Sequence, residues 1–128
     1  ETLLKMTNNE STQIITQEFI EDIYEGDFRI LIIHGKPFKK TLARIPQGDS
    51  FKGNLAAGGK GVVKDISDFQ FEMASEIGDF LIQKDINFAG IDVIGNFLTE
   101  INVTSPTCAR QILDQSGENP IQEYFEKL

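Results

Sequence analysis

FAGIDVIGNFLTEINV, residues 88–103, predicts a β-hairpin whose strands, 88–94 and 98–103, flank a turn at Gly95-Asn96. Apolar residues dominate both strands, but Asp92, Glu100 and Asn102 interrupt them. Burying such polar groups without partners costs about 2–7 kcal/mol each. The stretch therefore predicts either a bound metal ion or a half-exposed hairpin whose polar residues face water.

The register of this hairpin decides between the two interpretations. Glu100 and Asn102 are two residues apart, so they share one face of a strand. A two-residue turn would pair Asp92 with Thr99, whereas a three-residue loop would pair Asp92 with Glu100. Directly opposed carboxylates repel each other, and a divalent cation reverses that repulsion. Mg²⁺ is commonly held by one or two carboxylates together with phosphate oxygens, so the second register supports a metal site.

Outward from the hairpin, the sequence predicts an α+β fold. β-branched and aromatic residues mark further strands, joined by short turns that favour an antiparallel sheet of at least five strands with helices packed on one face. A capping box at Ser67 and Gln70 starts a long helix, whose core positions are predicted at Met73, Ile77, Phe80 and Leu81. The predicted elements are strands 13–20, 28–34 and 39–45, a helix over 67–84, a short helix after Pro106, and a last helix from Asn119-Pro120 to Leu128.

The stretch PQGDSFKGNLAAGGKG, residues 46–61, contains five glycines and almost no bulky apolar residue. Such a segment buries too little apolar surface to hold a fixed conformation, and long loops in compact domains are usually functional or disordered. It predicts a mobile loop over residues 46–60.

Composition limits the functional classes. The 128 residues fit one domain, 1–128, and 40% hydrophobic and 25% charged residues are typical of soluble globular proteins. No apolar run is long enough to span a membrane, and the net charge of −8 argues against nucleic-acid binding. The single cysteine, Cys108, favours a reducing, cytoplasmic compartment.

Two arginines stand out in the predicted strands. Arg29 opens the apolar strand 28–34, and Arg44 nearly closes the strand 39–45. Adjacent antiparallel strands could bring both guanidinium groups to one end of the sheet, where they suit phosphate or carboxylate recognition. The alternative is an ordinary surface or cross-strand ion pair.

An ordered set of motifs resembles bacterial glutathione synthetase, an ATP-grasp ligase. The set comprises Asp27-x-Arg29, LARIPQG (42–48), GNLAAGGKG (53–61) and GIDVIGN-LTEINVTSPT (90–107), within a resemblance that runs from about Gln17 to Arg110. The resemblance implies that this chain is a partial ATP-grasp domain, the C-terminal lobe of the family, without the family's N-terminal substrate domain. It favours a bound metal ion over a half-exposed hairpin as the reason for Asp92, Glu100 and Asn102.

The resemblance also implies roles for individual residues. Mg²⁺, or Mn²⁺, would be held by Asp92, Glu100 and Asn102. ATP would be bound by Gln17, Glu18, Phe19 and Ile20 through the adenine, with main-chain bonds from Glu18 and Ile20, and by Asp27 through the ribose. Arg29 and Arg44 would face the phosphates and the peptide substrate as catalytic residues. Substrate would be bound by Lys52, Gly53, Asn54, Lys60, Ser105 and Thr107.

The reaction implied is the ligation of γ-glutamylcysteine with glycine through an acyl phosphate, with ATP converted to ADP and phosphate. The partners implied are these small molecules, and the intact enzyme could form a homo-oligomer. Alternatives are an ATP-grasp ligase of another carboxylate substrate, or a non-catalytic nucleotide- or metal-binding module. The family carries arginine where this chain has Lys52 and Lys60, and lysine keeps the charge but lacks the bidentate fork. We expect the fragment alone to be inactive.

Overall fold

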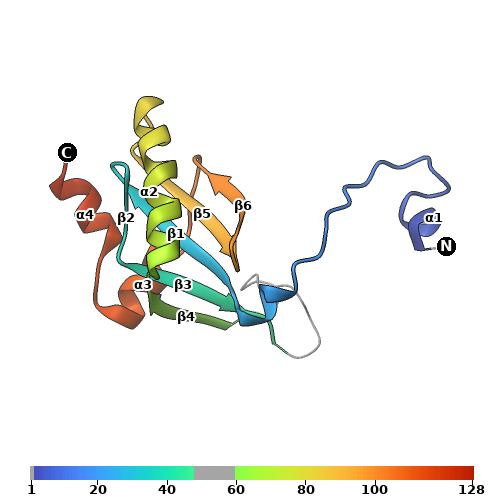
Figure 1. Cartoon of the computed structure of the whole chain (residues 1–128), viewed down its shortest axis with the longest axis horizontal. Helices are drawn as coiled ribbons and strands as arrows, with labels where there is room; N and C mark the ends of the chain where they lie inside the picture. The colour runs from blue at the N-terminus through green and yellow to red at the C-terminus, as the bar shows by residue number, and fades with distance from the viewer. Residues whose placement is uncertain (1, 48–59) are drawn as a thin grey trace.

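A computed structural model describes residues 2–47 and 60–128 of the chain (Figure 1). The elements in order are α1 (Thr2–Met6), the 3₁₀ helix η1 (Glu21–Glu25), β1 (Asp27–Ile33), β2 (Lys36–Pro37), β3 (Lys40–Ile45), β4 (Lys60–Asp65), α2 (Asp68–Gln83), β5 (Phe88–Ile94), β6 (Phe97–Asn102), α3 (Ala109–Ser116) and α4 (Pro120–Glu126). None of the helices in the described ranges is long and apolar enough to cross a membrane.

The strands form one antiparallel sheet in the order β4-β3-β1-β5-β6, with the short β2 paired to β1. This confirms the predicted α+β class and the expectation of at least five strands. β1 lies at the centre between β3 and β5. Its residues Ile30 to Ile33 are all buried, which explains why this strand is apolar at consecutive positions rather than alternating ones.

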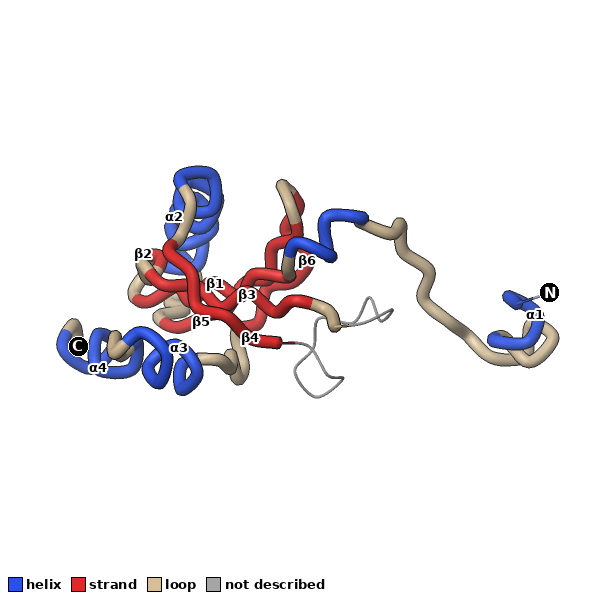
Figure 2. The backbone as a smooth tube through the Cα atoms, turned by 90° about the horizontal axis from the view of Figure 1, so that it is seen from below, coloured by secondary structure: helices blue, strands red, loops and turns tan. Residues whose placement is uncertain are grey.

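The helices cover both faces of the sheet, so the expectation that they pack on one face was wrong. On one face, Ile30 and Ile32 form a core cluster with Ala74 and Leu81 of α2. On the other face, Leu31 and Ile33 form a second cluster that includes Ile112 of α3. Figure 2 shows α2 on one side of the sheet and α3 and α4 on the other. Because β1 is apolar on both faces, each face needs its own cover.

Helix α2 begins with the predicted capping box. The Ser67 side chain accepts a hydrogen bond from the Gln70 amide, and the Gln70 side chain accepts one from the Ser67 amide. Leu81 is buried, and Met73 and Ile77 pack against the core cluster. Phe80 was expected in the core, but it is 54% exposed because it lies outside the buried stripe of the helix.

The segment 13–20 is not a strand, contrary to the sequence prediction. Within the described ranges it joins no ladder of the sheet, and it links α1 to η1 while extending away from the sheet (Figure 1). β-branched residues favour strands only where a neighbouring strand can pair with them. By contrast, β4 was not predicted, because its first residue Lys60 was assigned to the loop. The predicted mobile loop falls mostly on residues 48–59, outside those described.

The β5–β6 hairpin combines the two registers considered from the sequence. Ile94 pairs with Phe97 and Val93 with Leu98, so Gly95-Asn96 is a two-residue turn, with Gly95 at φ +56°. The register then shifts between Asp92 and Val93, so that Asp92 pairs with Glu100. The predicted pairing of the two carboxylates is therefore correct, but an irregularity in the ladder produces it rather than a three-residue loop.

Candidate functional site

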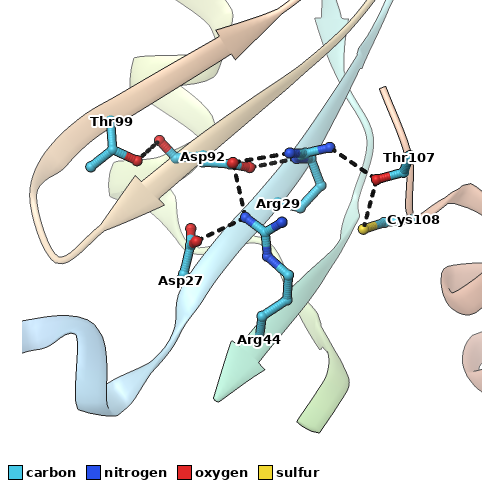
Figure 3. A network of polar contacts seen from close by, with 7 residues as sticks. All are labelled: Asp27, Arg29, Arg44, Asp92, Thr99, Thr107 and Cys108. Carbon is cyan, nitrogen blue, oxygen red and sulfur yellow. Dashed lines mark hydrogen bonds and ion pairs between the residues drawn. The ribbon is translucent and has the colours of Figure 1, made fainter. Parts of the chain in front are cut away.

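Four charged residues from three neighbouring strands meet on one face of the sheet (Figure 3). Asp27 and Arg29 lie on β1, Arg44 on β3 and Asp92 on β5. The ladder places Asp27 opposite Arg44 and Arg29 opposite Asp92, so all four side chains project from the same face. We call these four residues the arginine–carboxylate network. The predicted convergence of Arg29 and Arg44 at one end of the sheet is confirmed.

Asp92 is the centre of this network. Its side chain accepts hydrogen bonds from Arg29 Nε at Oδ1 and from Arg29 Nη2 at Oδ2, the latter at 2.9 Å. Arg44 Nη2 lies 2.9 Å from the same Oδ2. Burial alone would raise the pKa of the Asp92 carboxyl, but the two guanidinium groups outweigh burial and lower this pKa below its usual value. Asp92 is therefore ionised and satisfied, at 5% exposure.

The surroundings of Asp27 favour its ionised form less than those of Asp92 do. It accepts one hydrogen bond at Oδ2 from Arg44 Nη2, at 2.9 Å, the same nitrogen that contacts Asp92. Burial raises the pKa of the Asp27 carboxyl, and the attraction of Arg44 does not overcome it. Asp27 Oδ1 and Arg44 Nε are buried without a hydrogen-bond partner in the described part of the chain. These two atoms can still accept and donate a hydrogen bond, respectively.

Gly90 and Pro106 leave a slot for the stem of Arg29. A Cβ on Gly90 would lie 3.0 Å from both Arg29 Cδ and Pro106 Cβ, so a side chain here would push against the arginine. At the tip, Arg29 Nη1 donates to Thr107 Oγ1 at 3.4 Å, and that hydroxyl lies 3.7 Å from Cys108 Sγ. The structure thus brings Thr107 next to the network.

The three predicted metal ligands lie on the same hairpin, but their side chains have different environments. Glu100 faces the same side as its partner Asp92, and it is exposed. Asn102 Oδ1 accepts three hydrogen bonds of 3.1–3.3 Å, from the amides of Thr104 and Ser105 and from the Thr104 hydroxyl. No group of three or more acidic, histidine or cysteine side chains suited to a metal occurs within residues 2–47 and 60–128.

The sequence set Asp92 against a facing carboxylate and a cation, but two guanidinium groups surround its side chain. Its partners were missed because the pairing of β1 with β5 joins residues far apart in the chain, and no local pattern signals it. The chemistry of the donor set, two carboxylates and an amide oxygen, still suits a hard cation such as Mg²⁺.

The predicted adenine segment lines a pocket of about 540 Å³. Residues 15–20 form one wall, and Ile23, Ile94 and Thr99 form the remainder. Ile94 pairs with Asp27 in the sheet, which sets the pocket beside the arginine–carboxylate network. A pocket lined mostly by apolar surface suits a flat heteroaromatic ring.

Four predicted substrate contacts fall on or beside the loop. Lys52, Gly53 and Asn54 lie outside the described residues. Lys60 begins β4 opposite Ile45 and is exposed. Ser105 is also exposed and uses its amide in the turn closed by Asn102.

The family model and the similar proteins that match this chain all point to one protein family. The family model for the ATP-grasp domain of prokaryotic glutathione synthetase matches residues 1–117. The chain is 45% identical over 123 residues to glutathione synthetase of Xylella fastidiosa (strain 9a5c), covering 96% of this chain and 39% of that protein. It is 49% identical over 114 residues to glutathione synthetase of Nitrosomonas europaea, covering 89% of this chain and 36% of that protein. It is 47% identical over 116 residues to glutathione synthetase of Pseudomonas aeruginosa, covering 91% of this chain and 36% of that protein.

These relatives are more than twice as long as the chain, which spans 36–39% of their lengths. The matched region contains all of β1 to β6 and with them the arginine–carboxylate network. The chain therefore belongs to the prokaryotic glutathione synthetase family, within its ATP-grasp domain.

Proposed function

We propose that this chain is the ATP-binding lobe of a glutathione synthase, which joins γ-glutamylcysteine to glycine and converts ATP to ADP and phosphate. The observation that carries the proposal is the convergence of Arg29, Arg44, Asp27 and Asp92 beside an apolar pocket, in a chain of this family. The lone Cys108 and the small-molecule substrates of such a reaction are consistent with a cytoplasmic enzyme that binds neither nucleic acid nor membrane.

ATP would enter with its adenine in the pocket lined by residues 15–20. The main-chain groups of Glu18 and Ile20 would bond the ring edge, with Gln17 and Phe19 in the same wall. Asp27 would accept a hydrogen bond from a ribose hydroxyl. Its buried Oδ1 supports this role, because that atom accepts no hydrogen bond from any described residue.

The chemistry requires no side-chain nucleophile. The dipeptide's cysteinyl carboxylate attacks the terminal phosphorus of ATP, the bond from that phosphorus to the bridging oxygen breaks, and ADP leaves. The glycine amine then attacks the acyl carbon, phosphate departs, and the amine loses a proton. Arg29 and Arg44 would orient the transferring phosphoryl group and balance its charge, which is how enzymes of phosphoryl transfer gain most of their rate.

Mg²⁺, or Mn²⁺, would be held by Asp92, Glu100 and Asn102. When bound, the cation neutralises phosphate charge and makes the phosphorus more electrophilic. The remaining proposed contacts, to the dipeptide and glycine, are Lys52, Gly53, Asn54, Lys60, Ser105 and Thr107. Among these, Thr107 has the most direct support, because its hydroxyl accepts a hydrogen bond from Arg29.

The test is ADP release by the full-length protein with γ-glutamylcysteine, glycine and Mg²⁺. Arg44→Met should lower kcat by about a hundredfold or more, since it removes a charge that faces the phosphoryl group. Lys64→Met is the matched control, because Lys64 is exposed on β4 with its Nζ above the Phe28 ring, and the network does not use it. ADP release that does not depend on both γ-glutamylcysteine and glycine would contradict the proposal.

A further inference from the structure

Both carboxylate oxygens of Asp92 already contact a guanidinium group in this structure. Arg29 uses both of its carboxylate oxygens, and Arg44 lies against Oδ2. The second proposed ligand, Asn102, is also occupied, because its Oδ1 accepts from the amides of Thr104 and Ser105 and from a hydroxyl. Only Glu100 presents oxygens without a hydrogen bond or ion pair within the described residues.

Within the arginine–carboxylate network the charges are already balanced without a cation. Asp27 and Asp92 contribute two negative charges, and Arg29 and Arg44 contribute two positive charges, all partly or fully buried. A divalent cation arriving alone would add positive charge beside two guanidinium groups. It would also take Asp92 from them, and a buried guanidinium that loses its carboxylate is strongly destabilised.

An anionic polyphosphate changes this balance. Guanidinium groups bind phosphate oxygens with the same bidentate geometry that they use for carboxylates. If phosphates arrive together with the cation, Arg29 and Arg44 can exchange Asp92 for phosphate while Asp92 exchanges guanidinium for the cation. Every buried charge then keeps a partner.

Resting on the proposed function, we propose that the arginine–carboxylate network is a partner-exchange device that admits the cation and the nucleotide phosphates only together. In the ligand-free protein, Arg29 and Arg44 occupy the cation's place on Asp92. The consequence is a reciprocal coupling: the site binds free cation weakly and metal-free nucleotide weakly, and each strengthens the binding of the other.

Mn²⁺ binding to the full-length protein in the absence of nucleotide, followed by electron paramagnetic resonance, tests the device. Arg44→Met frees one side of Asp92 Oδ2, so this variant should bind Mn²⁺ alone about tenfold more tightly than the wild type. The same variant should bind a non-hydrolysable ATP analogue with Mg²⁺ more weakly. Lys64→Met removes one positive charge from the sheet without touching Asp92, and it should leave Mn²⁺ affinity at the wild-type value. Equal Mn²⁺ affinities in the two variants would overturn the proposal.

A second measurement on the wild type covers the case in which Arg44→Met does not fold. The Nε–H signals of Arg29 and Arg44 in ¹⁵N NMR spectra report what each guanidinium contacts. Mg²⁺ alone, or the ATP analogue alone in a chelator, should leave both signals nearly unchanged, and the two ligands together should move them. A full shift with Mg²⁺ alone would overturn the exchange, whereas no binding of Mg²⁺ and analogue together would instead contradict the proposed function.

Discussion

Asp27 and Asp92 share Arg44 Nη2, and yet their carboxyl pKa values shift in opposite directions. Asp92 faces two guanidinium groups, and its pKa is lowered. Asp27 faces one guanidinium that is already committed elsewhere, and burial raises its pKa. Ionised Asp92 thus stabilises the fold, whereas ionised Asp27 destabilises it. Such perturbed carboxyl groups are typical of binding and catalytic sites.

The free energy of unfolding of the Asp27→Asn variant should increase, relative to that of the wild type, as the pH rises. The folded-state pKa of Asp27 is raised, so its contribution to stability is fully present below the unfolded pKa of about 3.9 and is lost as the pH rises through the folded value. Asparagine removes this loss and keeps an oxygen for Arg44. Urea unfolding at about pH 3 and pH 7 measures the difference, and a variant that loses more stability at the higher pH would contradict it.

For Asp92→Asn the free energy of unfolding should decrease, relative to that of the wild type, as the pH rises. The lowered pKa means that the stabilising contribution is present above the unfolded pKa and disappears as the pH falls through the folded value. At neutral pH the variant leaves the buried Arg29 guanidinium without its anion and Arg44 with Asp27 alone, and we expect a loss of about 3 kcal/mol. The deficit should shrink in acid below about pH 3 in the same urea titrations. A deficit that is independent of pH would argue against the ion pairs as its cause.

The residues of the site were predictable from sequence, but their contacts were not. The strand pattern and the family resemblance pointed to Arg29, Arg44 and Asp92. The pairing of Arg29 with Asp92 depends on the register between β1 and β5, which no local pattern specifies. The space that Gly90 leaves for Arg29 was equally invisible, because it exists only once Pro106 has packed against the strand.

At the scale of elements, prediction succeeded where the elements carry their own local signals. Helix α2 has a capping box, β1 is strongly apolar, and short turns bound β1 and β3. It failed for segment 13–20, which has strand-forming residues but pairs with no described strand. It also missed β4, whose residues Gly61 to Asp65 follow a glycine-rich stretch and become a strand by pairing with β3.

Gly78→Ala should loosen the packing of α2 on the sheet. A Cβ at this position would lie 2.1 Å from Gly35 O, and Gly35 is held at φ +80° in the turn after β1. Neither backbone can give way without moving the helix, so we expect a loss of about 3 kcal/mol in urea unfolding. Asp79→Ala, at the next and exposed position, is the control and should change stability little. Equal stabilities of the two variants would show that the helix can shift freely.

Gln115 of α3 completes the hydrogen bonding of the edge strand β4. Its Oε1 accepts from the Val63 amide at 2.9 Å, and its Nε2 donates to Gly61 O at 2.9 Å. Gln115→Ala should speed hydrogen exchange at the Val63 amide about fivefold, the equivalent of one hydrogen bond of about 1 kcal/mol. Gln115→Glu keeps the acceptor and should keep the protection of Val63. Similar exchange rates in both variants would mean that the side-chain bond contributes nothing.

At the scale of the molecule, the chain contains one wall of the proposed nucleotide site. It spans 36–39% of the length of its relatives. Residues 1–128 produced alone are expected to bind Mg²⁺ and an ATP analogue weakly in calorimetry and to form no glutathione, because they correspond to little more than a third of the length of these relatives. Turnover by this segment alone would show that a single lobe is sufficient.

The central position of β1 has a consequence for synthesis of the chain. β1 can pair with β3 as soon as both have left the ribosome, but its other edge waits for β5, since Ile33 pairs with Phe88. During translation of α2 and the segments beside it, that edge stays open while it carries Ile30 to Ile33. An unpaired apolar edge is a template for wrong association between chains. This segment of the nascent chain is thus most vulnerable to aggregation between the emergence of β3 and that of β5.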